Sequence, residues 1–590
     1  MQTTGGSGGC SITTGGISVN GLCTAANSLH ISVAYRSIIP VIVLAIGALA
    51  LLAISAVLPK RSYPGLYAAL TSLIGVLALA AAVWEWYDLP GRQAGAKIGG
   101  QIIYDRFTVL FYILISTATI LGAITSDTYL RREGLDGVEA YVLMIMAATG
   151  AMLMSASGSL IMLFLGLEIM SISLYVMAAY HRRRTESGEA GLKYFILGSF
   201  SSAIFLYGVA LVYGATGSVY IVLIANYLTQ NVLASNGVLL AGMALLIVGL
   251  GFKIAAVPFH YWTPDVYQGA PTPFTGYMAA VAKAAGFAGL LRVLTEALNS
   301  QQSDWRPAIW LIAVLTLIVG SVLAIAQKDL KRMMAYSSIS QVGYVLVGLQ
   351  AASTTGIASA LFYLFTYTFI IIGTFAVIEL VQGTGEARND LGAIRGLSRR
   401  QPALAAVMLV FLLAQAGVPF TSGFLGKFYV IQASVQRGQY WLAVIAMLAA
   451  VVAAFFYLRV ALLMYGSPSG ELSIEPPSKL SPELSAKPTA ELSAKPSVEL
   501  SPALQGGSGT LPVAPALVDD YEPGVFGAGL EPIASLDGTN ATMALAPPPP
   551  GRVKVPFPVG VVLGLCAAFT IAAGVSSFAL DFAKAATTLF

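Results

Sequence analysis

The sequence predicts an all-α polytopic membrane protein with about fourteen spans, counted as apolar runs of about 20 residues. Hydrophobic residues make up 57% of the 590 residues and charged residues only 10%, whereas a soluble domain averages about 25% charged residues. Apolar segments follow one another from Ser37 onward. Two of the longest segments are interrupted by the same tripeptide, Val-Pro-Phe. These observations predict a membrane bundle with two related halves.

The predicted spans are joined mostly by short polar connections. Their approximate ranges are 37–58, 63–84, 105–126, 138–155, 158–180, 191–214, 237–268, 273–298, 306–326, 330–350, 355–382, 402–436, 438–465 and 557–580. Only a tight turn near Ser155 separates the fourth span from the fifth. The seventh and the twelfth are too long for one straight crossing, because about 20 residues suffice.

Proline interrupts each of these long spans. Pro258 lies inside the seventh and Pro419 inside the twelfth. A proline removes a helical hydrogen bond and clashes with the preceding turn, and in lipid the freed carbonyls must find partners in protein or water. Matching broken helices in two halves of a chain are typical of inverted-topology repeats with a functional site near the membrane midplane. Two ordinary proline kinks are the alternative.

The chain is therefore predicted to contain two repeats flanked by other segments. The predicted ranges are 1–36 for an extra-membrane tail rich in Gly, Ser and Thr, mostly loop, 37–130 for helices 1–3, 138–298 for the first repeat (helices 4–8), 306–465 for the second repeat (helices 9–13), 466–556 for a Pro-rich loop and 557–590 for helix 14. The loop repeats Glu-Leu-Ser-Ala-Lys-Pro from Glu483 and again from Glu491. This composition favours an extended, disordered linker.

Positive charges predict the orientation, because cytoplasmic loops carry an excess of Lys and Arg. The loops after the first, third, fifth, ninth and eleventh spans hold Lys60, Arg61, Arg131, Arg132, Arg182, Arg183, Arg184, Lys328, Lys331, Arg332, Arg388, Arg395, Arg399 and Arg400. The opposite side holds Arg92, Lys97, Arg306 and Arg437. Both termini are therefore predicted to lie outside, and the loop 466–556 to be cytoplasmic.

Two lysines and a glutamate lie deep within predicted spans. Lys253 precedes the first break, Lys283 lies midway along the eighth span, and Glu168 lies well inside the fifth. A charge at the bilayer centre costs at least roughly 2.5–3.5 kcal/mol, so such residues are functional by default. Because desolvation and a neighbouring carboxylate favour opposite protonation states of a lysine, a Glu168–Lys253 pair suits proton transfer. A polar clamp between helices is the alternative role for Glu168.

Three further residues extend this predicted site. Lys427 follows the second break and is the repeat-related counterpart of Lys253. Lys193 lies near the start of the sixth predicted span, where it either transfers protons or snorkels to the interface. His260 follows Pro258 and either relays protons near neutral pH or bonds freed backbone. The predicted proton-transfer residues are Glu168, Lys193, Lys253, His260, Lys283 and Lys427.

Several functional classes have no support in the sequence. The three cysteines form no Cys-x-x-Cys pair, which argues against an iron–sulfur cluster or structural zinc in this chain. Cys10 and Cys23 are either a disulfide or two free thiols. Neither a dinucleotide-binding glycine motif nor a Walker loop is present. The net charge of +4 is small, so nucleic-acid binding is not indicated.

Four stretches carry a family resemblance. They are Gly166–Ser171, Ala179–Phe195, Phe259–Pro273 and Lys331–Gln341. The first three closely resemble the subunit N family of NADH-quinone oxidoreductase, antiporter-like membrane subunits of respiratory complex I, and the fourth fits the wider antiporter-like family. The resemblance extends over roughly 37–465 and the last span, and it is most specific over 160–300.

The resemblance implies a proton channel built from two half-channels that a polar axis joins at the membrane midplane. The implied roles are the glutamate of the fifth helix (Glu168), the lysine of the sixth (Lys193), the lysines of the two broken helices (Lys253 and Lys427), the connecting lysine (Lys283) and an axis histidine (His260). Subunit M has a glutamate where Lys427 stands, which favours subunit N.

The resemblance also implies an environment for the chain. It predicts a subunit of a proton-translocating enzyme that carries no cofactor and performs no redox chemistry itself. NADH, FMN, iron–sulfur clusters and quinone would be bound by partner subunits. The expected partners are other membrane-arm subunits of complex I, including neighbouring antiporter-like subunits, and the lipid bilayer. The expected location is the bacterial cytoplasmic membrane.

Two other functions remain open from the sequence. A subunit of a multi-subunit sodium/proton antiporter would share the glutamate, the lysines and the broken helices. A structural subunit with an inactive channel would share them too, but its lysines would tolerate substitution. Proton flux, its dependence on Na⁺, and the identity of co-purifying subunits distinguish these alternatives.

Overall fold

The computed structural model describes residues 11–14, 17–20, 35–57, 64–89, 95–231, 236–386, 389–466 and 553–587. Twelve helices in this part of the chain are long and apolar enough to cross a membrane. Helix α12 and the broken pair α15 and α16 occupy the two remaining predicted spans. The prediction of an all-α polytopic membrane protein is therefore confirmed. Cys10, Cys23 and nearly all of the predicted loop lie outside the described residues.

The long helices agree closely with the predicted spans. Their bounds are α1 Ile39–Val57, α2 Leu66–Asp88, α3 Arg106–Arg132, α4 Val138–Ser155, α5 Leu160–Ala178, α6 Thr185–Thr216, α8 Gly237–Ile254, α10 Thr272–Arg292, α11 Gln302–Ile325, α12 Leu330–Gln350, α13 Thr354–Gln382, α17 Tyr440–Tyr465 and α18 Phe557–Val575. The tight turn between the fourth and fifth spans is present, since α4 and α5 pack against each other across residues 156–159.

Both predicted breaks are present. In the first repeat, α8 ends at Ile254 and α9 (Trp262–Gly269) follows, with Ala255 in the left-handed region at φ 63°. In the second repeat, α15 (Pro402–Ala416) and α16 (Ser422–Gln436) are separated by Gly417 at φ 88°. The two breaks thus lie at corresponding places in the two predicted repeats.

Two helices form the centre of the bundle. The spans Thr272–Ala297, which contains α10, and Thr354–Gln382, which is α13, are each 94% buried, whereas several outer spans are 39% buried or less. Small residues let α10 approach its neighbours closely. A Cβ added at Gly276 would lie 2.8 Å from Phe375 Cβ, and one added at Gly286 would lie 2.7 Å from Ile254 Cγ2. Helix α10 therefore has no spare space around these positions.

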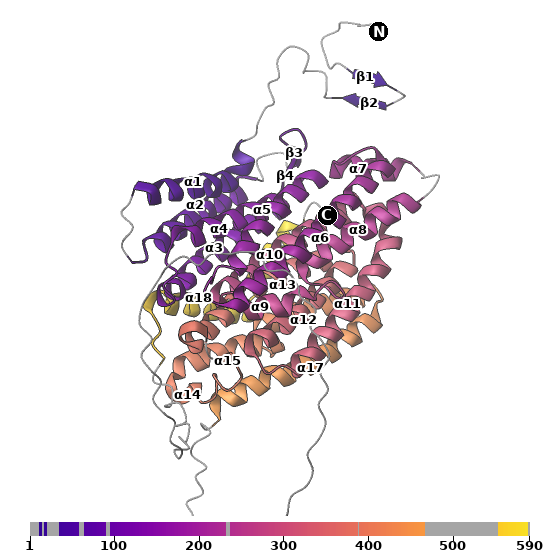
Figure 1. The fold of residues 1–590 in the computed structure, drawn as a ribbon. Coiled ribbons are helices and arrows are strands. Elements are labelled where there is room, and N and C mark those ends of the chain that lie inside the picture. The colour runs from indigo at the N-terminus through magenta and orange to yellow at the C-terminus, as the bar shows by residue number, and fades with distance from the viewer. Residues whose placement is uncertain are drawn as a thin grey trace, which may run out of the picture. The chain divides into compact units, whose positions relative to one another are not determined.

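The C-terminal helix α18 packs on the outside of the bundle, with 39% of its span buried. Figure 1 shows α18, in yellow, beside helices that occur much earlier in the chain, and it packs against α13, α16, α15 and α3. The short α19 (Phe578–Ala586) then packs on α13 and α3, and its Phe582 packs on Trp86 with ring centroids 4.1 Å apart and the rings tilted by 34°. The final span therefore completes the wall of the second repeat.

The structure corrects several details of the prediction. Helix α6 begins at Thr185, six residues before the predicted span. Its first two turns are polar because they face a hydrophilic cleft, so they do not belong to the apolar run that marked the span. In the tail, which was predicted to be mostly loop, β1 (Ser11–Thr14) pairs with β2 (Ile17–Asn20). A second hairpin joins β3 (Gly95–Lys97) to β4 (Ile102–Tyr104). The short helices α7 (Ile221–Gln230), α14 (Leu397–Arg400) and α19 also lacked a predicted span.

Candidate functional site

Lys253 lies in the last turn of α8, immediately before the first break. The residue is 2% exposed. Its Nζ donates hydrogen bonds to Ser171 Oγ on α5 (2.8 Å) and to Tyr194 OH on α6 (3.3 Å). The same nitrogen lies 5.5 Å from the ring centroid of Tyr175 and 5.2 Å from that of Tyr194. Hydroxyl groups and aromatic faces therefore replace water around this amine.

Glu168 lies one helical turn before Ser171 on α5 and is half-buried. Its Oε1 is buried and has no hydrogen-bond partner among the described residues. No ion pair joins Glu168 to Lys253 in the described part of the chain, so the direct contact that the sequence suggested is not made. The reason is that α5 presents Ser171, and not Glu168, to the amine.

Lys283 lies midway along the central helix α10 and is 2% exposed. Its Nζ donates to the Ser338 carbonyl on α12 (2.9 Å) and to Ser338 Oγ. Ser338 Oγ in turn shares a 2.6 Å hydrogen bond with Tyr367 OH on α13. The rings of Tyr267 and Tyr367 lie 5.9 Å and 5.6 Å from the nitrogen. Lys283 therefore connects the first repeat to helices of the second.

Aromatic rings lie between Lys253 and Lys283. Tyr194 stacks on Trp262 with centroids 4.4 Å apart, and Trp262 meets Tyr267 edge-on at 6.2 Å. The two lysines come from neighbouring helices, because a Cβ added at Gly286, one turn after Lys283, would lie 3.6 Å from Lys253 Cβ. The two lysines therefore lie on neighbouring helices, and a chain of ring contacts leads from Tyr194, which Lys253 touches, to Tyr267, which lies beside Lys283.

Lys427 lies on α16, just after the second break, and is 5% exposed. Its Nζ donates to the carbonyls of Gln415 (2.7 Å) and Ala416 (3.0 Å), which the break has released from helical hydrogen bonding. The nitrogen lies 4.8 Å from the Tyr344 ring. Lys427 therefore supplies a donor to the carbonyls that the break frees, and these carbonyls supply acceptors to its amine.

Polar side chains of α12 connect the surroundings of Lys283 and Lys427. Ser337, the neighbour of Ser338, donates to Gln415 Oε1 (3.1 Å). Gln341 Nε2 donates to the Gln415 carbonyl (3.3 Å), the same oxygen that accepts from Lys427. The roles of Ser337, Ser338, Gln341 and Gln415 were not predicted from the sequence. A run of polar residues inside an apolar span, Ser337-Ser338-Ile339-Ser340-Gln341, was the available signal.

Lys193 is in a different environment from the deep lysines. Its side chain is 41% exposed and its Nζ contacts Glu189 Oε1 (2.5 Å) and Asp265 Oδ2 (3.0 Å). Arg332 contacts the other oxygen of Asp265 at 2.6 Å. These four residues line a polar cleft of about 610 Å³ at one membrane face of the bundle. Lys193 is therefore not at a helix end, as the predicted span suggested, but two turns inside α6 and open to the cleft.

His260 lies between α8 and α9 and is 5% exposed. Its Nδ1 is buried without a hydrogen-bond partner among the described residues, and its ring packs on Tyr261 with centroids 4.7 Å apart. No hydrogen bond between His260 and any of the four predicted lysines is present in the described part of the chain. The structure therefore places His260 at the break and outside the contacts that join Lys283 to Lys427.

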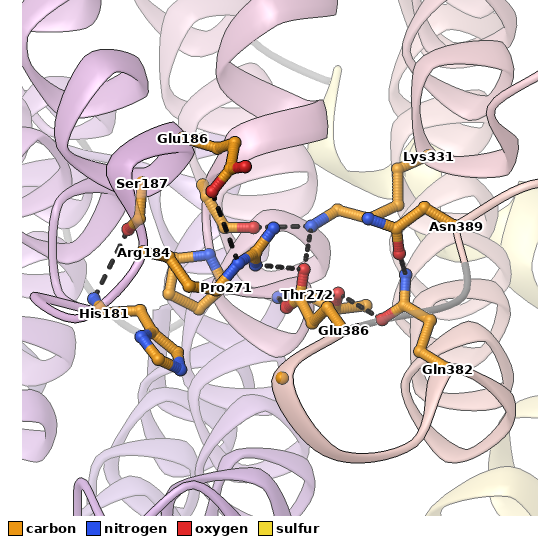
Figure 2. A network of polar contacts seen from close by, with 12 residues as sticks. His181, Arg184, Glu186, Ser187, Pro271, Thr272, Lys331, Gln382, Glu386 and Asn389 are labelled. Carbon is orange, nitrogen blue, oxygen red and sulfur yellow. Dashed lines mark hydrogen bonds and ion pairs between the residues drawn. The ribbon is translucent and has the colours of Figure 1, made fainter. Parts of the chain in front are cut away.

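Glu386 is the hub of a buried network that the sequence analysis missed (Figure 2). Its Oε2 accepts from Arg184 Nη1 (2.6 Å) and Lys331 Nζ (2.8 Å), and its Oε1 accepts from Thr272 N and Oγ1, both at 2.8 Å. Burial opposes ionisation, but Lys331 and Arg184 outweigh it and lower the pKa of Glu386 to about 2. One carboxylate thus joins the start of α6, the start of α10 and α12.

The described residues contain no group of three or more His, Cys, Asp or Glu residues placed to hold a metal ion. The site consists instead of amines, hydroxyls, amides and carboxyl groups, most of them held in the interior by helix packing. Such groups can accept, hold and donate protons.

Comparison with known proteins identifies the family. Residues 157–453, which include both broken helices and all six predicted proton-transfer residues, match the family described as NADH:quinone oxidoreductase/Mrp antiporter, TM. NADH-quinone oxidoreductase subunit N of Trichlorobacter lovleyi is 43% identical over 435 residues, covering 74% of this chain and 88% of the relative. The chain belongs to the NADH-quinone oxidoreductase subunit N family.

Solved structures agree with this family. A chain of respiratory complex I from Thermus thermophilus with bound aureothin is 34% identical, with a TM-score of 0.61, and the alignment covers 73% of this chain and 90% of that one. A chain of the Mrp complex from a Dietzia species has a TM-score of 0.71 and covers 94% and 97%, but at 19% identity it shows a shared fold alone. The subunit N family and the Mrp complex therefore share this architecture.

Proposed function

We propose that this chain is a proton-translocating membrane subunit of an NADH:quinone oxidoreductase, respiratory complex I. The family membership supports the complex, and one observation carries the transport role: three buried amines, on Lys253, Lys283 and Lys427, lie within the bundle with hydroxyl, amide and aromatic groups around them. A charged lysine inside the membrane costs several kcal/mol, so three of them in one bundle support a functional role.

The proposed path uses the residues in spatial order. Protons are taken up in the polar cleft beside Lys193 and Asp265 and reach Lys253. Transfer to Lys283 passes the aromatic rings between the two amines. Ser338, Ser337 and Gln415 then connect Lys283 to Lys427, from which protons leave on the opposite side. Glu168 adjusts the charge on Lys253 through space, one helical turn from the serine that Lys253 contacts.

The driving energy must come from partner subunits. Moving one elementary charge against 100 mV costs about 2.3 kcal/mol, and we assign no redox chemistry to this chain. In the proposal, NADH, FMN, iron–sulfur clusters and quinone react in other subunits. The resulting electrostatic changes reach Glu168 and the lysines through neighbouring membrane-arm subunits, including other antiporter-like ones. The chain then acts as the proton-conducting part of the enzyme.

The orientation follows from the charge distribution. In the proposal the cleft at Lys193 faces the cytoplasm of a bacterium, both termini lie on the outer side, and the loop 466–556 is cytoplasmic. The repeats 138–298 and 306–465 each contribute one half of the path. Both broken helices then approach the proposed path through Lys253, Lys283 and Lys427, one from each membrane face.

The deciding experiment removes the amine that joins the repeats. The Lys283→Met variant, assembled in the complex in inside-out vesicles, should lose NADH-driven proton uptake by about 100-fold, the scale of a lost acid–base group. The Lys554→Met variant, in which an exposed lysine is replaced, is the control and should pump normally. Unchanged pumping by Lys283→Met in assembled complex would instead support a structural subunit with an inactive channel.

The second candidate function is a subunit of a multi-subunit Na⁺/H⁺ antiporter, which the fold shared with the Mrp complex favours. Purification of the chain from native membranes separates the two candidates. Co-purification of flavin and iron–sulfur subunits is expected for the proposed function. Their absence, together with proton flux that depends on Na⁺, would replace it with the antiporter.

A further inference from the structure

A cavity of about 360 Å³ lies where α11 begins, beside the end of α12 and the turn between α16 and α17. The residues that line it include Gln302, Arg306, Pro307, Trp310, Gln350 and Gln439, and none of its lining residues is acidic. A second cavity, of about 500 Å³, is lined by Arg437. The two cavities adjoin, because Gln302 lines both. Two arginines therefore border one hollow at the end of the bundle.

The two arginines converge on the end of α12. Arg306 Nε donates to the Gln350 carbonyl (3.0 Å), and Arg437 Nη2 donates to the Ala352 carbonyl (2.9 Å). Because these carbonyls are two residues apart, the two guanidinium groups lie close together. In the part of the chain that the structure describes, each arginine makes only this hydrogen bond and forms no ion pair. A guanidinium has five N–H donors, so both keep donors for a ligand.

One carboxylate lies nearby but belongs to another contact. Glu296 lines the cavity that Arg437 borders. Its Oε1 lies 2.5 Å from Nη1 of Arg292, which also contacts Asp105 at 2.6 Å. No ion pair joins Glu296 to Arg437 in the described part of the chain. The two positive charges at the end of α12 are therefore not neutralised by a direct contact.

A buried amide in the first cavity also lacks a partner. Gln350 lines this cavity and is 3% exposed. Its Oε1 accepts no hydrogen bond from the described residues. A buried polar atom without a partner is unfavourable. The site therefore offers an acceptor for a hydroxyl group beside two donors for an anion.

The surface next to the cavity is apolar and aromatic. Helix α11 is an outer helix, with 39% of its span buried. Beyond Pro307, Leu311 and Ile318 follow at helical spacing and are 53% and 46% exposed. Trp441, at the start of α17, is 77% exposed, and tryptophan is enriched where a membrane meets water. The cavity therefore lies at the level of lipid headgroups, with an apolar strip leading from it along α11.

We propose that this cavity binds an anionic phospholipid whose headgroup carries hydroxyl groups, as that of phosphatidylglycerol does. The phosphate accepts hydrogen bonds from Arg306 and Arg437, because guanidinium groups bind phosphate in a bidentate fashion. A headgroup hydroxyl donates to Gln350 Oε1. An acyl chain lies along Pro307 and Leu311. A choline headgroup has no hydroxyl group to donate and brings a cation toward the arginines, so phosphatidylcholine binds less tightly.

Photolabelling tests this proposal on the full chain in its purified assembly. The assembly is placed in phosphatidylcholine nanodiscs that contain a small fraction of phosphatidylglycerol with a photoreactive acyl chain. Peptides that cover 302–318 should be labelled. Labelling should fall about fivefold in Arg306→Gln and about fivefold again in the double variant with Arg437→Gln, since each basic side chain contributes roughly 1 kcal/mol near an anionic surface. Phosphatidylcholine with the same acyl chain should label these peptides less in the parent protein.

The control variant is Arg36→Gln, which removes an exposed arginine before α1. It should leave the labelling of 302–318 unchanged and controls for total surface charge. Phosphatidylcholine labelling that stays constant in the arginine variants shows that they remain folded. Labelling does not depend on proton transport, so its result is independent of the proposed function.

Four outcomes would overturn the proposal. Two of them are equal labelling by the two lipids in the parent protein and unchanged labelling in the double variant. The third is loss of phosphatidylglycerol labelling in millimolar inorganic phosphate, because the site would then bind the free anion. The fourth is the absence of labelling by either lipid, because a neighbouring subunit would then cover the cavity.

Discussion

The two broken helices hold their lysines in different ways. Lys253 precedes its break and donates to the hydroxyls of Ser171 and Tyr194. Lys427 follows its break and donates to the carbonyls of Gln415 and Ala416 that the break releases. The sequence predicts that these two lysines occupy corresponding positions in the two repeats, and both amines are buried beside tyrosine rings. Their hydrogen-bond acceptors, however, are chemically distinct.

Because their acceptors differ, the two sites should respond differently when the charge on the lysine changes. Backbone carbonyls are fixed acceptors that require a donor, so the second break depends on Lys427 for its own stability. Hydroxyl groups rotate and can donate as well as accept, so the surroundings of Lys253 can adapt to a change in its charge. Glu168 lies on α5 one helical turn before Ser171, which Lys253 contacts. The first lysine is therefore placed to respond to charge, and the second to maintain a defined geometry.

The largest effect is expected at Glu386. Its carboxylate joins the start of α6 and the start of α10 to α12, and so holds together the two repeats that carry the two lysines. The pKa of Glu386 is lowered from 4.5 to about 2. A lowered carboxyl pKa stabilises the fold above the unfolded value, and this stabilisation, roughly 3 kcal/mol, is lost as pH falls from 4.5 towards 2. Thermal unfolding of the purified protein at pH 6 and at pH 3 measures it.

The Glu386→Gln variant supplies the control for this prediction. It should be less stable than the parent protein at pH 6, and the difference should shrink at pH 3, where the parent is losing the same contribution. A constant difference at both pH values would show that the carboxylate charge is not what joins the start of α10 to α12.

The next largest effect tests what the two lysines share. Replacement of either Lys253 or Lys427 by methionine removes the only group at that site that carries an exchangeable ammonium proton. Proton uptake per NADH oxidised should fall about 100-fold in each variant, measured in inside-out vesicles. Lys584→Met, in an exposed lysine of α19, should pump normally. Retained pumping in Lys427→Met alone would make the second lysine purely structural and would sharpen the contrast further.

A smaller effect separates the two sites directly. Lys427→Met leaves the Ala416 carbonyl without this donor and the Gln415 carbonyl with Gln341 Nε2 alone, and an unsatisfied buried group costs about 1–3 kcal/mol. Lys253→Met leaves hydroxyls that can donate to other acceptors, as Ser171 already does to the Leu167 carbonyl. Lys427→Met should therefore be less stable than Lys253→Met by about 2 kcal/mol, measured by unfolding in detergent. Equal stability would remove the proposed distinction between fixed and adaptable acceptors.

The smallest effect is expected at Lys193, which serves as the exposed reference for both deep sites. Its side chain is 41% exposed and contacts Glu189 and Asp265. Exposed ion pairs contribute about 0.2–1 kcal/mol, so Lys193→Gln should change stability by less than about 1 kcal/mol. Raising the salt concentration should reduce this difference, because solvent ions screen exposed pairs. A larger, salt-independent loss would mean that Lys193 is effectively buried in the assembled protein.

The sequence was sufficient for the spans and the breaks, and depth within an apolar span pointed to Lys253, Lys283 and Lys427. Their partners could not be predicted in the same way. Ser171 rather than Glu168 meets Lys253 because of the rotation of α5, which only packing determines. Arg184 and Glu386 are 202 residues apart, and a glutamate in a Gly-Thr-Gly-Glu turn reads as an exposed loop residue. Tertiary contacts of this range leave no local pattern.

The close packing of α10 has a mechanical consequence. At Gly276 and Gly286 even one added carbon would press on Phe375 and Ile254, so this helix cannot slide or rotate without parting from both repeats. Transporters that rock their halves apart do so over microseconds to milliseconds, whereas side chains change rotamer within picoseconds to nanoseconds. We expect the helices of the bundle to keep their positions during transport, while the lysine side chains change their conformation in each cycle.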